Sequence, residues 1–130
     1  ECGGLMYLSQ GLTTLEGKRV PMAGLLPLEV RMLPRLKALG YREVTLQQDC
    51  LLGPVGIRAR GHEFHYSEIS GLDASLPPAY RVRARRREQD GWEGFCHGNI
   101  LASYVHLHFG SNPEMAQHLV NFCRQYKERL

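Results

Sequence analysis

The sequence predicts a mixed α/β fold, and three segments of the 130-residue chain carry this prediction. Residues 80–97 alternate side-chain types with a period of two on both sides of Asp90-Gly91, which is typical of a β-hairpin. Residues 112–130 repeat apolar side chains at spacings of three and four, which indicates an amphipathic helix. Near the other end, we expect a short helix to begin at Gly3 or Gly4, directly after Cys2.

The composition is that of a globular protein, because hydrophobic residues make up 43% of the chain and charged residues 22%. One hydrophobic core is feasible at this length. No apolar run approaches the ~20 residues of a membrane-spanning helix, so we expect no membrane contact. The net charge of +3 is too small to indicate a nucleic-acid partner. Because the sequence begins at Glu1 and not at Met, we expect a processed product or a piece of a longer protein.

Between residues 17 and 40, frequent Pro and Gly exclude one long helix. A short helical turn is expected over Arg31–Leu39, interrupted at Pro34. Short strands are expected at Tyr41–Leu46 and Val55–Ala59. We find no internal repeat and no domain linker, so we treat the chain as one unit.

The second half of the chain should contain a hairpin, a buried strand and a helix. After the hairpin, Trp92–His97 leads into a turn, and the apolar and aromatic residues of Ile100–Phe109 predict one buried strand. Asn112 is a good N-cap and Pro113 suits the first helical position, while Ser111 and Glu114 have the spacing of a capping box.

Four cysteines are widely spaced, at positions 2, 50, 96 and 123. No CxxC pair occurs, which excludes a zinc ribbon and a thioredoxin-type motif. With no signal peptide, reduced thiols in a cytoplasmic protein fit better than two disulfides.

Cys2-Gly3-Gly4 is the first candidate for chemistry. A nucleophile elbow exposes a reactive side chain on a strained turn before a helix, and the next backbone N–H stabilises an oxyanion. Gly3 would supply that N–H. The alternative is a Gly-rich tail without function.

A cysteine nucleophile needs a base, which is most often a histidine that lies near it in space. His106 and His108 are two residues apart and should share one face of a strand. The alternatives are two structural histidines, or a two-histidine metal site that lacks an identifiable third ligand. We therefore predict no metal site.

Residues 60–67 place His62, Glu63, His65 and Ser67 beside Gly61. The two histidines are three apart, whereas a zincin needs them four apart on a helix. Such a dense polar stretch predicts a loop over a site, and the alternative is a hydrogen-bonded loop that braces the fold. The arginines of Arg81–Arg87 favour a solvated hairpin face, with a non-catalytic basic binding module as the alternative function.

Four stretches in the same order and spacing resemble the C-terminal glutamine amidotransferase domain of the cobyrinic acid a,c-diamide synthases. They are Glu-Cys-Gly-Gly-Leu-Met-Tyr-Leu (1–8), Leu-Gly-Tyr-Arg-Glu (39–43), Arg-Gly-His-Glu-Phe-His-Tyr-Ser (60–67) and Ala-Ser-Tyr-Val-His-Leu-His-Phe (102–109). The resemblance implies a flavodoxin-like class I glutamine amidotransferase fold without its N-terminal part. Residues 1–130 would be the C-terminal portion of that domain, starting at the nucleophile elbow, with the ATP-binding synthetase domain absent.

The resemblance also implies an activity, in which an ATP-dependent ligase amidates the a and c carboxylates of cobyrinic or hydrogenobyrinic acid for cobalamin biosynthesis. Glutamine supplies ammonia, and ATP with Mg²⁺ binds the N-terminal synthetase domain, so no cofactor is expected within this chain. Cys2 matches the nucleophile and His106 the general base. Many class I amidotransferases carry a Glu that orients the catalytic histidine where this chain has His108, so His108 is the candidate for orienting His106 or lining the pocket. Many also carry Gln where this chain has Met6. His62, Glu63, His65 and Ser67 are expected to line or brace the pocket.

Two related enzymes are the alternatives. Cobyric acid synthase more often reads Gly-Tyr-Glu-Ile-His in the loop that matches residues 61–65, so this chain favours the a,c-diamide synthases, whereas a nickel-sirohydrochlorin a,c-diamide synthase would share these motifs. The expected partners are glutamine, a corrinoid and the protein's own synthetase domain. We expect the isolated chain to be weakly active or inactive, because the strand that delivers Cys2 should lie upstream. Exposed sheet edges should also favour self-association of the fragment.

Overall fold

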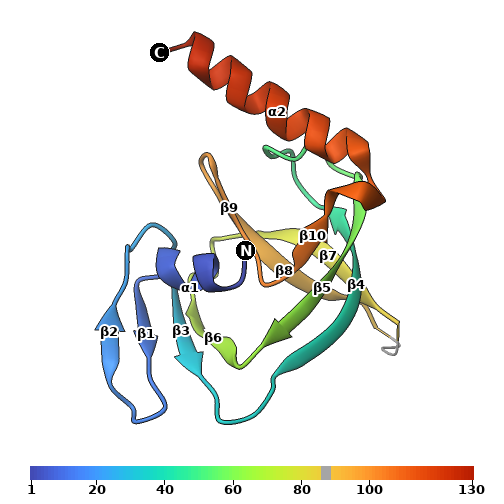
Figure 1. The fold of residues 1–130 in the computed structure, drawn as a ribbon. Helices are drawn as coiled ribbons and strands as arrows, with labels where there is room; N and C mark the ends of the chain where they lie inside the picture. The colour runs from blue at the N-terminus through green and yellow to red at the C-terminus, as the bar shows by residue number, and fades with distance from the viewer. Residues whose placement is uncertain (86–88) are drawn as a thin grey trace.

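The computed structural model describes residues 1–85 and 89–130, which form two β-sheets, two α-helices and one 3-10 helix (Figure 1). The elements in chain order are α1 (Gly3–Leu8), β1 (Gly11–Thr13), β2 (Arg19–Pro21), β3 (Leu28–Met32), β4 (Ala38–Leu46), β5 (Arg58–His65), β6 (Ser67–Leu72), β7 (Pro78–Ala84), β8 (Gly91–His97), β9 (Ile100–Ala102), β10 (His106–His108), η1 (Phe109–Ser111) and α2 (Pro113–Glu128). The mixed α/β class that the sequence predicts is confirmed.

The strands form a four-stranded sheet in the order β2-β1-β3-β6 and a six-stranded sheet in the order β10-β5-β4-β7-β8-β9. Within the described residues, β1 and β3 pair in parallel and the other strand pairs are antiparallel. Figure 1 shows α1 between the two sheets, with the N-terminus beside the six-stranded sheet.

A bent two-stranded ribbon joins the sheets. β3 continues through a turn into β4, and β5 continues through Tyr66 into β6, so each long segment contributes one strand to each sheet. At the bend, the Leu33 N–H donates to the Tyr66 carbonyl at 2.7 Å and the Lys37 N–H donates to the His65 carbonyl at 3.0 Å. These bonds replace regular pairing where the ribbon turns.

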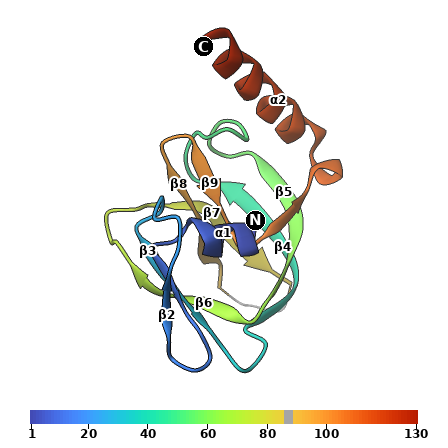
Figure 2. The ribbon, with the colours of Figure 1, turned by 60° about the vertical axis from the view of Figure 1, so that its left-hand side comes forward.

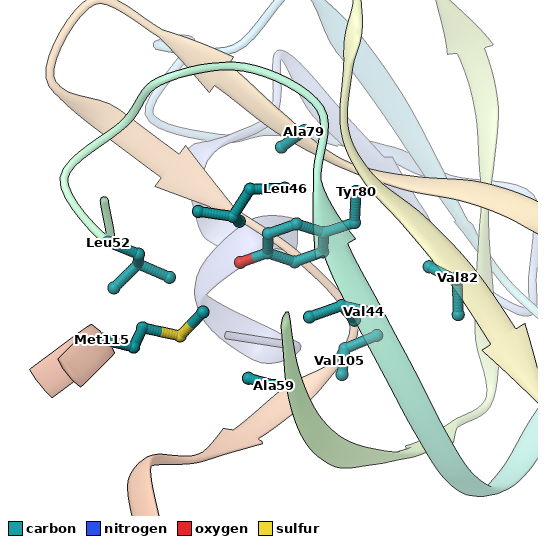
Figure 3. Close-up of a cluster of buried hydrophobic side chains, with 9 residues drawn as sticks. All are labelled: Val44, Leu46, Leu52, Ala59, Ala79, Tyr80, Val82, Val105 and Met115. Carbon is teal, nitrogen blue, oxygen red and sulfur yellow. The ribbon is translucent and has the colours of Figure 1, made fainter. Parts of the chain in front are cut away.

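Two clusters of buried hydrophobic side chains stabilise the sheets. The first lies on the inward face of the six-stranded sheet, where Figure 3 shows Tyr80 among aliphatic side chains from several strands and Met115 from α2. The second surrounds α1, where fully buried Leu5 packs with Leu26, Leu28 and Val30. Because Leu5 is three residues after Cys2, burial of this helix fixes the position of Cys2.

Several predicted elements are confirmed and others are wrong. The short helix after Cys2, the antiparallel pairing of β7 with β8 and the C-terminal helix are present. The turn expected at Asp90-Gly91 is not there, because Gly91 is the first residue of β8 and pairs with Val82. The helical turn expected over Arg31–Leu39 is absent, because its ends belong to β3 and β4 and Pro34 lies in the turn between them. The strand expected at Val55–Ala59 begins only at Arg58, since Gly53 and Gly56 have φ of 127° and 92° and form turns.

The loop expected over residues 60–67 is instead strand. Burial alternates regularly along β5, with Gly61, Glu63 and His65 facing inward. The sequence does not show the usual alternation of apolar and polar residues, because inward-facing positions of β5 are polar. The strand expected over Ile100–Phe109 is two short strands, β9 and β10, because residues 103–105 leave the sheet.

Helix α2 begins as predicted, with the Asn112 side chain accepting a hydrogen bond from the Glu114 N–H at 3.2 Å. The capping box does not form, because the Ser111 hydroxyl donates to the His108 carbonyl at 2.7 Å. Met115 is fully buried, whereas Tyr126 is about half exposed. Figure 2 shows the C-terminal part of α2 projecting from the sheets. None of the described helices is long and apolar enough to cross a membrane.

Gly61 allows β10 to approach β5, which yields a first prediction. A Cβ at this position would lie 2.1 Å from the His106 carbonyl oxygen. We expect Gly61→Ala to displace β10 and lower the free energy of unfolding by about 1–3 kcal/mol. Thermal denaturation measures this loss. Gly71→Ala is the matched control, because its Cβ would contact only Glu29 at an ordinary 3.5 Å. An equal loss in both variants would contradict the prediction.

Candidate active site

Cys2 occupies a strained turn at the start of α1. Its φ of 46° and ψ of −103° make it the only non-glycine residue with positive φ in residues 1–85 and 89–130. Such a conformation costs on the order of 1–3 kcal/mol and persists only where neighbouring structure holds it. Here the Cys2 N–H donates to the Ser103 carbonyl at 2.8 Å, and the Cys2 carbonyl accepts from the Met6 N–H at 3.2 Å. The predicted nucleophile elbow therefore has the expected backbone geometry.

The two glycines after Cys2 leave open space. A Cβ added at Gly3 or Gly4 would meet no atom within 4 Å. Neither glycine is therefore needed for packing inside the chain, and both leave room for a ligand to approach the elbow. The Gly3 N–H lies in the first turn of α1, where no preceding helical carbonyl is available to it.

Residues 103–105 form the platform on which Cys2 rests, and the Glu93 side chain of β8 holds this platform. The Ser103 hydroxyl and the Tyr104 N–H both donate to the Glu93 carboxylate, the latter at 2.8 Å. The Val105 N–H in turn donates to the Ser103 hydroxyl at 2.9 Å. Burial raises the pKa of Glu93, and the hydrogen bonds from Ser103 and Tyr104 oppose that shift.

His106 directly follows this platform, on β10 at the edge of the six-stranded sheet. Its ring stacks on that of His62 in β5, with centroids 4.8 Å apart and planes within 8°. Its Nδ1 atom lies 3.7 Å from Oε2 of Glu1. A second oxygen of Glu1, Oε1, accepts a hydrogen bond from the Leu107 N–H at 2.9 Å.

The Cys2 thiol approaches the same end of β5. It donates to the Phe64 carbonyl at 3.9 Å, two residues beyond His62, at the point where β10 no longer pairs with β5. Thiol, His106, His62 and Glu1 thus gather at one edge of the sheet. Catalytic hydrogen bonds are often long before substrate binds, and this grouping can deliver a nucleophile and a base to one ligand.

The other predicted site residues lie apart from this group. Glu63 forms a buried ion pair with Arg42 at 2.9 Å on the inward face. His65 donates from Nδ1 to the Ser67 carbonyl at 2.8 Å, and its ring stacks on Tyr104. The Ser67 hydroxyl lies 2.8 Å from the Tyr104 hydroxyl, whose pKa burial raises to about 12. His65 and Ser67 thus contact Tyr104 of the platform, whereas Glu63 holds β5 to Arg42 of β4.

His108 lies at the rim, paired across the sheet with Arg60 and close to Gly110. The nearest carboxylate to His106 is therefore Glu1, which sequence reasoning did not consider. Its only sequence signal was its position directly before Cys2. Glu93 was also missed, because no local pattern marks the hydrogen bonds that its carboxylate accepts from Ser103 and Tyr104.

The arginine-rich segment is only partly described, since Arg86 and Arg87 lie outside the described residues. Arg81 pairs with Asp90 at 2.6 Å. Arg83 and Arg85 line a cleft of about 690 Å³ together with Tyr41 and Arg60. Among the residues that the structure describes, no group of three or more His, Cys, Asp or Glu side chains could hold a metal ion.

Residues 1–114 match the family of CobB/CobQ-like glutamine amidotransferase domains. The chain belongs to this family. The matched residues include the elbow, β5, the platform and β10. Membership of this family is consistent with the predicted flavodoxin-like class I glutamine amidotransferase fold. The sheets and helices of the structure agree with a mixed α/β class.

Curated relatives match this chain over most of its residues. A cobyrinate a,c-diamide synthase of Leptospira interrogans is 47% identical over 125 residues, which is 95% of this chain and 27% of the relative. Enzymes of the same name from Syntrophotalea carbinolica and Priestia megaterium are 47% and 41% identical, over 95% and 98% of this chain and 28% and 27% of the relatives. The chain thus spans about a quarter of the length of the relatives that it matches.

The role of Glu93 in holding the platform gives a second prediction. Glu93→Ala leaves the Ser103 hydroxyl and the Tyr104 N–H without their acceptor, and it should lower the free energy of unfolding by about 1–3 kcal/mol. Thermal denaturation at neutral pH measures the change. Glu43→Ala is the control, because Glu43 makes only a long ion pair with exposed Arg60. A Glu93→Ala variant as stable as this control would show that the platform does not depend on the carboxylate.

Proposed function

We propose that this chain is the glutamine-hydrolysing part of an ATP-dependent amidoligase. The ligase would convert the a and c carboxylates of cobyrinic acid, or of hydrogenobyrinic acid, to amides in cobalamin biosynthesis. Membership of the amidotransferase family supports glutamine use, and the names of the curated relatives support cobyrinate as the substrate. The observation that carries the proposal is the strained Cys2, held beside the strand that bears His106.

In the proposed reaction, His106 takes the proton of the Cys2 thiol, and the thiolate attacks the amide carbon of glutamine. The Gly3 N–H faces the developing oxyanion, which is the role that backbone donors fill in acyl transfer. The tetrahedral intermediate collapses, the leaving nitrogen takes a proton from His106, and ammonia departs. Water then hydrolyses the glutamyl thioester and regenerates the Cys2 thiol. Two easier steps replace one difficult step, as in other covalent mechanisms.

Ammonia would then react with an activated carboxylate of the corrinoid. We assign ATP and Mg²⁺ to a synthetase domain outside this chain, as the greater length of the relatives suggests. That domain and the corrinoid would be the partners of this amidotransferase unit. We place the enzyme in the cytoplasm, where its four free cysteines stay reduced.

A Cys2→Ala variant tests the proposal in the protein as its gene encodes it. We expect glutamine hydrolysis to fall by about 10³-fold or more, because the nucleophile is lost. Amidation supported by added ammonium salt should persist, since free ammonia bypasses this step. Ammonia release and the mass of the corrinoid product measure the two reactions. Cys123→Ala, at an exposed position on α2, is the control. Undiminished glutamine hydrolysis by Cys2→Ala would refute the proposed role.

Labelling gives a further prediction, in which Cys50 must be distinguished from Cys2. A side-chain hydrogen bond with Cys96 lowers the pKa of Cys50 below its usual range, although burial acts in the opposite direction. Iodoacetamide at neutral pH should therefore modify Cys50, because the thiolate is the reactive form. A diazo ketone analogue of glutamine should modify Cys2 and spare the other cysteines. Peptide mass spectrometry locates both labels, and attachment of the analogue to Cys50 in preference to Cys2 would contradict the proposal.

A further inference from the structure

The carboxylate of Glu1 contacts both the backbone and the side chain of β10. Oxygen Oε1 accepts the Leu107 N–H at 2.9 Å, and Oε2 lies 3.7 Å from Nδ1 of His106. The Leu107 contact fixes one oxygen, so the second oxygen is held next to the imidazole ring. A shift of less than 1 Å would bring it within hydrogen-bond distance of Nδ1.

Glu1 is also held by the same turn that positions Cys2. The Glu1 carbonyl accepts the Gly4 N–H at 2.9 Å, and the following Cys2 N–H donates to the Ser103 carbonyl. Consecutive residues thus carry the thiol and the carboxylate, and both are tied to the segment that leads into β10. Any movement of this turn would move both groups relative to His106.

The remaining groups that face His106 do not offer a negative charge. His62 of β5 stacks on one face of the ring. Arg60 and His108 lie two pairs further along β5 and β10. Elsewhere in the described residues, the Glu63 carboxylate is paired with Arg42 and the Glu93 carboxylate with Ser103 and Tyr104.

We propose that Glu1 is a positioning residue for His106 in glutamine hydrolysis, an inference that rests on the proposed function. A neutral imidazole has one N–H donor and one acceptor nitrogen. A carboxylate beside Nδ1 selects the form with the proton on Nδ1, which leaves Nε2 free to take the proton of the Cys2 thiol. The same carboxylate stabilises the imidazolium that forms after proton transfer. Glu1 thereby fills the role that the resemblance left open at His108.

Glu1→Gln separates the charge from the anchoring contact. The amide oxygen of Gln can still accept the Leu107 N–H, whereas the negative charge beside Nδ1 is lost. In the protein as its gene encodes it, we expect kcat for glutamine hydrolysis to fall about tenfold or more. The reason is that the variant loses part of the rate enhancement that a correctly positioned base gives. KM should stay within about twofold, because Glu1 does not contact glutamine in the proposed mechanism. Glu16→Gln, at an exposed turn position, is the matched control.

The division between kcat and KM, together with rescue by the conservative variant, is a readout that a purely structural role would not give. Glu1→Asp should recover part of the lost rate, because it restores the carboxylate. A Glu1→Gln enzyme with wild-type kcat would overturn the proposal, provided that Cys2→Ala is inactive in the same assay. An active Cys2→Ala enzyme would instead refute the glutaminase function itself.

A second measurement does not depend on activity. The ¹⁵N chemical shifts of the His106 ring report which nitrogen carries the proton, and His106→Gln identifies the signals. We expect the Nδ1–H form to predominate in the neutral ring of the wild-type protein. Predominance of the Nε2–H form would overturn the assignment of Glu1.

Discussion

The hydrogen bond from the Cys2 N–H to the Ser103 carbonyl is the constraint on which the candidate site depends. It ties the start of α1 to the gap between β9 and β10, two parts of the chain that are about a hundred residues apart in sequence. The Ser103 end is held by Glu93, and the Cys2 end is held by the burial of Leu5. Strain at Cys2 is tolerated because both of its sides are fixed.

The polar residues that segment 60–67 contributes to β5 have two different roles, depending on the face of the strand. Its outward face presents His62 to His106, and its inward face carries Glu63 and His65 into buried contacts. Buried polar groups of this kind are costly unless they are paired, and here each has a partner. The inward residues therefore hold β5 and the platform in place, while the outward residue takes part in the group around Cys2.

This arrangement explains why a small chain carries so many histidines and carboxylates near one edge. Glu93 and the His65–Tyr104–Ser67 contacts are support for the backbone. Glu1, Cys2, His62 and His106 gather where β10 pairs with β5. On β5, the buried residues that hold the backbone and the outward His62 lie on opposite faces, because alternate residues of a strand face opposite sides.

The sequence by itself determined the local elements and the identity of the reactive pair. The Gly-Gly after Cys2 and the Asn112-Pro113 cap are local signals, and each predicted its helix correctly because neighbouring residues decide helix starts and caps. The motifs of the amidotransferase family also singled out Cys2 and His106. The segment 60–67 was assigned wrongly as a loop, since its inward positions are polar and the usual alternation of apolar residues was missing.

Only the tertiary structure decided which polar residues meet. The pairing of Glu1 with His106, the stacking of His62 on His106 and the contact of Glu93 with residues 103–105 all join distant segments. No local pattern encodes them, because they follow from the register between β5 and β10 and from the bend that joins the two sheets. The break between β9 and β10 also depends on a tertiary contact, because the Tyr104 N–H donates to the Glu93 carboxylate of β8 and not to a neighbouring strand.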